Sequence, residues 1–391
     1  MQPAARLQAA IDILAALEGT PAPADKVMKG WFATRRYAGS GDRRAIGEIV
    51  YRILRRRYSL GWRMGGDAPR ALVIALLLAD GQDPASLFTG GHGPEPLSDA
   101  ECNTIATAPA EPPLSVVCEY PPWLEGELRR RFGDSLKEEI AAFLERAPVD
   151  LRVNTLKAAR GEVLAQLQQD GFDCAAVGEH GIRCAAGVLN KHALYLSGAF
   201  EIQDLAAQIA AERARAKPGM RVLDLAAGAG GKSLALAAAM ENRGEIVAAD
   251  PRGSALAELE KRAARAGIDI IRTKIISGGE GLDGPFDLVF VDAPCSGSGT
   301  WRRQPELKSR LTPERLTVFN QTQDALLARG AALAGGGLVY ATCSILPCEN
   351  EDRVEAFLAE NPHFARAQPD FQGSPAATAT DGFYAAFLVR N

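Results

Sequence analysis

The sequence lacks long apolar runs and is poor in histidine. The longest apolar stretch, residues 71–79, is far too short to span a bilayer. The first twenty residues carry charged side chains and no apolar block, so we expect no signal peptide and a cytoplasmic protein. The four histidines are scattered and never four residues apart, which argues against a metal site. We therefore expect neither a membrane span nor a bound metal ion.

The sequence also lacks any Cys-x-x-Cys pair. Its seven cysteines are an odd number and fit neither a disulfide framework nor a zinc ribbon. A free cysteine is most often a small buried hydrophobe, and we expect this role for four of the seven. These four are Cys102, Cys118, Cys174 and Cys184. For Cys348 we expect a helix-capping or packing role, which leaves Cys295 and Cys343 as candidates for chemistry.

Charge is unevenly distributed along the chain. The formal net charge is −4, yet residues 29–70 hold eleven Lys or Arg against three Asp or Glu. A basic surface on an acidic protein is a typical electrostatic footprint for a phosphate backbone. The arginines expected to bind RNA are Arg43, Arg44, Arg55 and Arg56. The alternative is a solvated helix face without a partner.

The amino-terminal part of the sequence has the apolar periodicity of helices. Three helices are predicted, at about residues 7–17, from Ser40 to about residue 56, and over 70–79. Two stretches rich in Gly, Pro or Ala, 81–97 and 107–113, are interpreted as linkers. At 391 residues the chain is too long for one ordinary core, so we expect two or three domains, the first over residues 1–90.

Between the linkers and residue 200 the pattern is mixed. Helices are predicted near 123–146 and after Lys157, a strand at 150–154, and short strands near Cys174 and Ile182. We therefore predict a small α+β module over residues 114–197.

Strands and helices alternate from about residue 200 to the end. The apolar, β-rich runs are residues 221–227, 245–250, 287–294 and 337–344, and the helical segments are 231–241, 252–266 and 313–334. This alternation implies a parallel sheet covered on both faces, with ligands at the carboxyl ends of its strands. We assign this α/β part, residues 198–391, to a third domain.

A glycine-rich loop follows the first of these strands and leads into a helix. It comprises Ala226, Ala227, Gly228, Ala229, Gly230, Gly231, Lys232 and Ser233. A dinucleotide fingerprint would need glycine at position 233, and a P-loop would need glycine at position 226. Asp250, about twenty residues past the glycines, can accept both ribose hydroxyls of an adenosyl ligand. The loop favours S-adenosylmethionine, with a P-loop ATPase or a ligand-free turn as alternatives.

Two thiols follow neighbouring strands, Cys295 in Asp-Ala-Pro-Cys and Cys343 in Ala-Thr-Cys-Ser. Carbon 5 of cytosine is too electron-poor to take a methyl group unaided. A thiolate that adds to carbon 6 makes carbon 5 nucleophilic, and a second group must then remove a proton. Lys232 is a candidate to favour the thiolate, and Asp292 could hydrogen-bond the cytosine edge.

These motifs resemble those of the RsmB/NOP2/Sun family of RNA cytosine-5 methyltransferases. The resemblance rests on Asp-Ala-Pro-Cys-Ser-Gly-Ser-Gly-Thr, on Ala-Thr-Cys-Ser followed by Glu349-Asn350-Glu351, and on the Gly-Gly-Lys loop. The Gly-Ser-Gly-Asp-Arg-Arg helix resembles the NusB-like RNA-binding domain of the bacterial rRNA members. Two departures are Ala229, where the family has proline, and the lack of a clear acidic residue around 274–279, near the expected adenine.

The resemblance implies a fold, an activity and a division of roles. The fold is an α/β class I methyltransferase domain with a seven-stranded sheet whose last strand is residues 383–390, preceded by an all-α domain and an α+β module. In the family the nucleophile falls on Cys343, and Cys295 assists product release. The opposite assignment resembles DNA cytosine-5 methyltransferases. The expected cofactor-binding residues are Ala226, Ala227, Gly228, Ala229, Gly230, Gly231, Lys232, Asp250 and Asp292.

The predicted function is methyl transfer from S-adenosylmethionine to carbon 5 of a cytosine in RNA, and the resemblance implies ribosomal RNA. Sequence-specific RNA enzymes work mostly on unstacked bases, so the target is expected in a loop or single strand, flipped into the site of a monomeric protein. A P-loop ATPase and a non-catalytic RNA-binding assembly factor are the alternatives.

Overall fold

The computed structural model describes residues 1–276 and 281–391, which divide into two compact units. The first unit is Met1–Glu145 together with Trp301–Arg310, and the second is Arg146–Thr300 together with Leu311–Asn391. The helical unit thus runs past residue 90 and takes in a segment that lies far along the chain. Within the described ranges, no helix is both long and apolar enough to cross a membrane.

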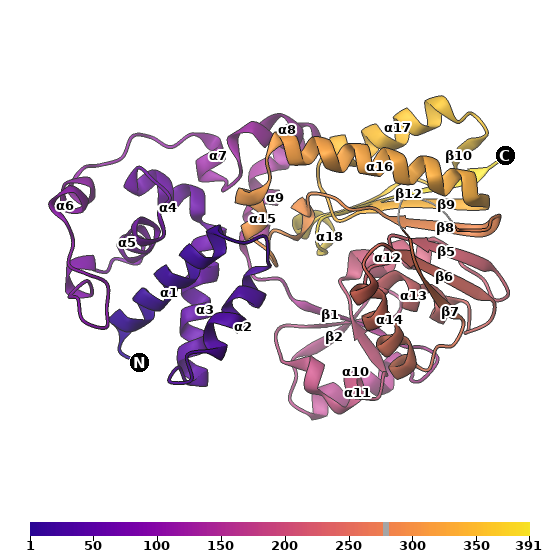
Figure 1. Cartoon of the computed structure of the whole chain (residues 1–391), viewed down its shortest axis with the longest axis horizontal. Coiled ribbons are helices and arrows are strands. Elements are labelled where there is room, and N and C mark those ends of the chain that lie inside the picture. Colours follow the sequence, from indigo (N-terminus) through magenta and orange to yellow (C-terminus); the bar gives the residue numbers. More distant parts are fainter. Residues whose placement is uncertain (277–280) are drawn as a thin grey trace. The chain divides into compact units, whose positions relative to one another are not determined.

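The first unit is helical (Figure 1). Its longer helices are α1 (Pro3–Glu18), α2 (Ala24–Ala33), α3 (Ser40–Arg55), α4 (Arg57–Met64), α5 (Pro69–Ala79), α6 (Asp99–Ala106), α8 (Glu125–Phe132) and α9 (Leu136–Leu144), with the short α7 (Leu114–Val117) and α15 (Glu306–Arg310). The apolar helix α5 lies in the core, where Leu72 to Leu77 are all buried, and α1 and α4 pack against it. The three predicted helices are confirmed as α1, α3 and α5, and α3 begins at Ser40, the residue from which the second helix was predicted.

The second unit begins with a four-stranded antiparallel sheet in the order β2-β3-β1-β4. Its elements are β1 (Val149–Val153), α10 (Arg160–Gln169), β2 (Cys174–Val177), β3 (Gly181–Cys184), α11 (Ala193–Leu196) and β4 (Phe200–Ile202). The expectation that Cys174 and Cys184 are free buried thiols is wrong, because they face each other across β2 and β3 and form a disulfide. Two alternating strands joined by a short turn bring side chains ten residues apart into this register.

The rest of the second unit is built on a large sheet of eight strands in the described residues. The strands are β5 (Arg221–Leu225), β6 (Glu245–Asp250), β7 (Ile271–Ile275), β8 (Phe286–Asp292), β9 (Ala334–Thr342), β10 (Phe364–Arg366), β11 (Phe371–Gly373) and β12 (Phe383–Arg390). The order is β7-β6-β5-β8-β9-β12-β10, in which β5 to β9 are parallel and β12 is antiparallel to β9. Both β10 and β11 pair with the outer edge of β12, so eight strands fill seven places. This confirms the predicted class I methyltransferase sheet.

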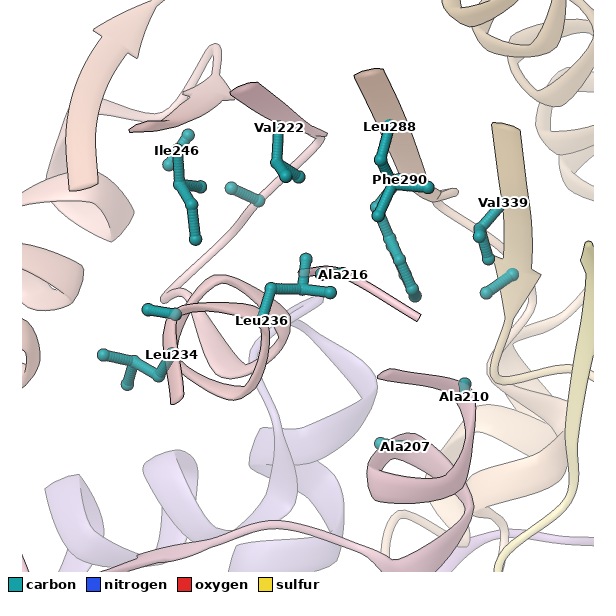
Figure 2. Close-up of a cluster of buried hydrophobic side chains, with 14 of the residues drawn as sticks. Ala207, Ala210, Ala216, Val222, Leu234, Leu236, Ile246, Leu288, Phe290 and Val339 are labelled. Atoms are coloured by element: carbon teal, nitrogen blue, oxygen red, sulfur yellow. The ribbon is translucent and has the colours of Figure 1, made fainter. Parts of the chain in front are cut away.

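Helices cover both faces of this sheet (Figure 1). One face carries α12 (Leu205–Arg213), α13 (Gly231–Ala239) and α14 (Gly253–Ala266), and the other carries α16 (Pro313–Leu333) and α17 (Glu351–Glu360). A short helix, α18 (Pro375–Thr378), precedes β12. Figure 2 shows the first face, where Val222, Ile246 and Phe290 of the strands meet Leu236 of α13. Alternate strand residues such as Leu223 and Val289 face α16 and α17, because side chains on a strand alternate between its two faces.

The glycine loop lies between β5 and α13. Gly230 caps α13 with a left-handed φ of +79°, and a Cβ there would lie 2.0 Å from Cδ1 of the buried Leu259 on α14. Only glycine permits both the left-handed backbone and this close approach of the loop to α14. The loop is therefore seated directly on the helix that follows β6.

Replacing Gly230 with alanine should destabilise the second unit by about 2 to 5 kcal/mol, the sum of left-handed strain and overpacking against Leu259. Gly219 is a matched control, because its φ is +88° but nothing lies within 4 Å of its virtual Cβ. Gly219→Ala should lose only the strain, about 1 to 2 kcal/mol. Urea titrations that gave equal losses of unfolding free energy for both variants would contradict the seating of the loop on α14.

Candidate active site

The two candidate thiols lie at the ends of neighbouring parallel strands. β8 and β9 pair in register, with Asp292 opposite Ala341, so the loops that follow them leave the sheet at the same edge. Cys295 and Cys343 are both partly exposed, and their Sγ atoms lie 3.3 Å apart. The thiols therefore form a pair rather than two independent sites.

The surroundings of the pair treat the two thiols differently. The hydrogen bond to Cys343, then burial, then the charge of Cys343 and last that of Glu349 raise the pKa of Cys295 well above its usual value. Cys295 is consequently protonated at neutral pH, and its S–H can donate to the sulfur of Cys343. This arrangement suits a neutral thiol beside a thiolate.

Lys232 and Asp292 form an ion pair beside the thiols, with Nζ 2.7 Å from Oδ2. Burial alone would lower the pKa of Lys232, but the charges of Asp292 and Cys343 outweigh burial and raise it. The ammonium therefore stays charged, and it also lies 5.2 Å from the centre of the Phe383 ring. The Lys232 cation therefore lies within electrostatic range of Cys343.

The P-loop alternative is opposed by the position of Ser233. In a P-loop the hydroxyl at this place binds Mg²⁺. Here Ser233 is fully buried and donates to Oδ2 of Asp224, while Lys232 is occupied by Asp292. The strand order agrees with this exclusion, because β6 lies directly beside β5 as in dinucleotide-type sheets.

Asp224, which the sequence analysis did not single out, has the properties of a cofactor ligand. It precedes the glycine loop on β5 and is fully buried, and burial raises its pKa to about 7. Its Oδ1 atom has no hydrogen-bond partner among the described residues. A buried carboxylate oxygen without a donor fits an ammonium group, such as the one at the amino-acid end of S-adenosylmethionine.

Asp250, the predicted ribose ligand, is already engaged. Its carboxylate accepts hydrogen bonds from the backbone N–H of Gly228 at 2.8 Å and from the Arg252 guanidinium at 2.9 Å. Burial opposes the charged form of Asp250, but these bonds prevail and lower its pKa. The side chain of Arg252 is 66% exposed, so it can swing away when ribose hydroxyls approach. Of the stretch expected near the adenine, residues 277–280 lie outside the described part of the chain.

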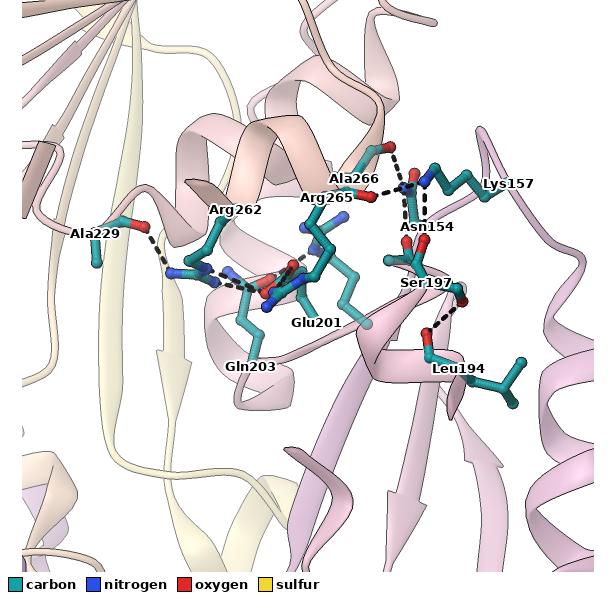
Figure 3. Close-up of polar contacts among 12 residues, drawn as sticks. Asn154, Lys157, Leu194, Ser197, Glu201, Gln203, Ala229, Arg262, Arg265 and Ala266 are labelled. Atoms are coloured by element: carbon teal, nitrogen blue, oxygen red, sulfur yellow. Dashed lines mark hydrogen bonds and ion pairs between the residues drawn. The ribbon is translucent and has the colours of Figure 1, made fainter. Parts of the chain in front are cut away.

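The small module holds the other side of the glycine loop, as Figure 3 shows. Arg262 of α14 bridges Glu201 of β4 and the carbonyl of Ala229, at 2.9 and 2.6 Å. Gln203 donates to the carbonyl of Gly231 at 3.1 Å. Asn154 donates to the carbonyl of Ala266 at the end of α14, at 2.9 Å. The module, α14 and the loop therefore support one another within the second unit.

The basic surface is smaller than the sequence suggests. Several arginines form ion pairs inside the first unit, namely Arg52 with Asp80, Arg57 with Glu18 and Asp67, and Arg70 with Glu101. Arg55 is half-buried, lies over the Tyr51 ring and donates to the carbonyl of Arg302. Arg43, Arg44 and Arg56 are exposed.

One group of side chains has ligand atoms suited to a metal ion. Glu179, His180 and Glu212 place these atoms within 4.8 Å of one another in the described part of the chain. Burial and the charge of Glu179 raise the pKa of Glu212 to about 7, so a proton competes for this site. None of the three residues belongs to the thiol loops.

Known proteins share this architecture. Residues 214–389 match the family model described as 16S rRNA methyltransferase RsmB/F, and residues 120–190 match its ferredoxin-like domain. A relative named probable ribosomal RNA small subunit methyltransferase B, from Synechocystis, is 33% identical over 66% of this chain. The chain spans 60% of that relative's length, and 59 and 55% of two further relatives.

Solved structures show the same fold. The crystal structure of PH0851 has a TM-score of 0.81 and 23% identity, and the match covers 99% of each chain. A methyltransferase homologue from Pyrococcus horikoshii has a TM-score of 0.64 and 26% identity over 71% of this chain and 97% of its own. The fold and the family models agree with the thiol and glycine-loop geometry, and residues 120–190 and 214–389 of this chain are similar to the RsmB/F family of methyltransferases.

Proposed function

We propose that this protein methylates carbon 5 of a cytosine in ribosomal RNA, with Cys343 as the nucleophile. The observation that carries the proposal is the thiol pair, whose sulfurs lie 3.3 Å apart beside the Lys232–Asp292 ion pair. Methylation of an oxygen or an exocyclic nitrogen needs no thiol. Methylation of carbon 5 needs one group that adds to carbon 6 and another that handles a proton. The naming of the relatives as ribosomal RNA methyltransferases supports the choice of RNA.

Each side chain then has a step to perform. The Cys343 thiolate adds to carbon 6 of cytosine, and the new bond makes carbon 5 nucleophilic. Bound S-adenosylmethionine supplies an electrophilic methyl group. A base then removes the proton from carbon 5, the bond between Cys343 and carbon 6 breaks, and the thiolate leaves. The carboxylate of Asp292 can accept a hydrogen bond from the cytosine edge near N3 while it stays paired with Lys232. This bond would stabilise the ring during the addition.

The environment of the thiols supports this division of labour. Cys295 is the thiol whose pKa is raised, and Cys343 is the thiol that interacts with the Lys232 cation. A thiolate is the nucleophilic form of cysteine, so the attacking residue should be the one that ionises more readily. Cys295 is then suited to exchange a proton while the product is released.

The cofactor would bind along the carboxyl edge of the sheet. We assign the orphaned oxygen of Asp224 to the ammonium group and Asp250 to the ribose, after Arg252 has moved. The glycine loop, from residue 226 to Lys232, would approach the ligand closely. Asp292 would lie beside this site through its ion pair with Lys232. The target cytosine must leave its stack to reach the thiols, at a cost of a few kcal/mol.

We retain the three functional parts of the sequence analysis as proposals: residues 1–90 for RNA binding, 114–197 for the module, and 198–391 for catalysis. The matched family models lie at 120–190 and 214–389, close to the second and third parts.

The two thiols should give different products when each is replaced. Cys343→Ala should abolish methylation and leave no covalent RNA adduct, because the attacking group is gone. Cys295→Ala should still attack and methylate, then stall as an adduct that migrates slowly on a denaturing gel. The exposed Cys102 in the first unit supplies a control, since Cys102→Ala should behave as the wild type. An adduct with Cys343→Ala and none with Cys295→Ala would reverse the assignment.

The exposed arginines on α3 and at its C-cap should contribute electrostatic affinity for RNA. Replacing Arg44 and Arg56 with alanine should weaken RNA binding and lower the slope of log K against log salt by about 1 to 2, the effect of two lost phosphate contacts. Cofactor affinity should stay unchanged. The variant with Arg129 and Arg130 replaced removes the same charge from α8 and is the control. Equal slopes for both variants would indicate that the α3 surface is a solvated helix face without a partner.

A further inference from the structure

A buried carboxylate lies beneath the two thiol loops. Glu349 is fully buried in the short 3-10 turn Pro347–Glu349. Its Oε1 accepts the backbone N–H of Ser296 at 2.8 Å, and its Oε2 accepts the hydroxyls of Ser296 and Ser344, each at 2.5 Å. Ser296 follows Cys295 in the sequence, and Ser344 follows Cys343. One side chain therefore binds the residue next to each thiol.

Further contacts tie the same loops together. Asn350 accepts a hydrogen bond from Thr342 Oγ1 and donates one to the carbonyl of Ser344 at 3.0 Å. The backbone N–H of Gly299 donates to the carbonyl of Cys343 at 2.9 Å. The position of one sulfur relative to the other is consequently fixed by a network of which Glu349 is the centre.

The carboxylate of Glu349 has no cationic partner in the described part of the structure. Gln323 supplies the fourth donor, at 3.1 Å, and all four donors are neutral. A buried charge without a counter-ion costs several kcal/mol unless hydrogen bonds satisfy it. A packing role at this position could be filled by an apolar side chain without that cost. The retained charge therefore points to an electrostatic role.

The charged and titratable groups around Cys295 show what that role is. They are Cys343 on the other loop, Glu349 below, Tyr340 on β9, and the Lys232–Asp292 pair. The negative charge of Glu349 disfavours a second negative charge on Cys295, and it contributes to the raised pKa of that thiol. The Lys232 cation lies near the other thiol, Cys343.

Resting on the proposed function, we propose that Glu349 is a positioning residue that clamps both cysteine loops and whose charge sets the different roles of Cys295 and Cys343. Glu349 touches neither thiol, so it acts through Ser296, Ser344 and its field. Clamp and charge can be separated by substitution.

Glu349→Gln keeps the size of the side chain and removes the charge. Without the charge the pKa of Cys295 falls, so its alkylation by iodoacetamide should begin at lower pH than in the wild type. The alkylated peptides of Cys295 and Cys343 are distinguished by mass spectrometry. We expect kcat for RNA methylation to fall at least about tenfold, because without the charge Cys295 competes with Cys343 to become the thiolate. KM values for RNA and cofactor should stay within about twofold, because the substitution leaves the contacts that bind RNA and cofactor in the ground state unchanged.

Two variants keep the charge and disturb the clamp. Glu349→Asp withdraws the carboxylate by one methylene, and Ser344→Ala cuts its link to the Cys343 loop. Both should lower kcat while the order in which the thiols titrate stays that of the wild type. If Glu349→Gln fails to fold, Ser344→Ala still tests the clamp, and an unchanged kcat in Ser344→Ala would overturn it.

The control is Asp150→Asn, which neutralises another buried carboxylate of the second unit, one that pairs with Arg183. It should lower the melting temperature without moving the thiol titration. A titration curve of Glu349→Gln that coincides with the wild type, or a shift also seen with Asp150→Asn, would overturn the role of the charge. The alkylation needs neither RNA nor cofactor. Failure of the proposed function would instead appear as a wild-type protein that methylates no cytosine.

Discussion

The parallel pairing of β8 with β9 is the interaction on which the candidate site depends. Parallel strands in register end at one edge of the sheet, so the loops after Asp292 and Thr342 must leave side by side. That placement brings Cys295 and Cys343 into contact although 48 residues separate them in the chain. Apolar side chains on both faces of these strands hold the register, because slipping by one residue would move each side chain to the opposite face and disrupt its packing against the covering helices.

Charges around this edge are arranged so that the two thiols differ. Lys232 and Asp292 form an ion pair beside the thiols, whereas the carboxylate of Glu349 is bound only by neutral donors in the described part of the structure. Two identical side chains in contact would otherwise share one proton without preference. The asymmetry of their surroundings supplies a preference, as the proposed division of roles between the two sulfurs requires.

Much of this architecture could be predicted from the sequence, because its signals are local or periodic. The last strand was predicted at its observed bounds, and the thiols were placed at strand ends by the apolar runs before them. The predictions that were wrong or missing depend on contacts between distant segments. The disulfide between Cys174 and Cys184 depends on the register of a hairpin, and the ion pair between Asp250 and Arg252 depends on the turn after β6. Glu349 was noticed only as part of a motif, since its four donors come from three separate segments.

If the protein methylates carbon 5 of cytosine, the methyl group replaces the hydrogen on that carbon. Tritium release measures this replacement directly. Ribosomal RNA would be transcribed with cytidine tritiated at carbon 5 and incubated with the protein and methyl-labelled S-adenosylmethionine. Substitution at carbon 5 releases one tritium to water for each methyl group incorporated, and the account predicts this ratio. Methyl incorporation without tritium release would place the methyl group on nitrogen or oxygen and would contradict the account.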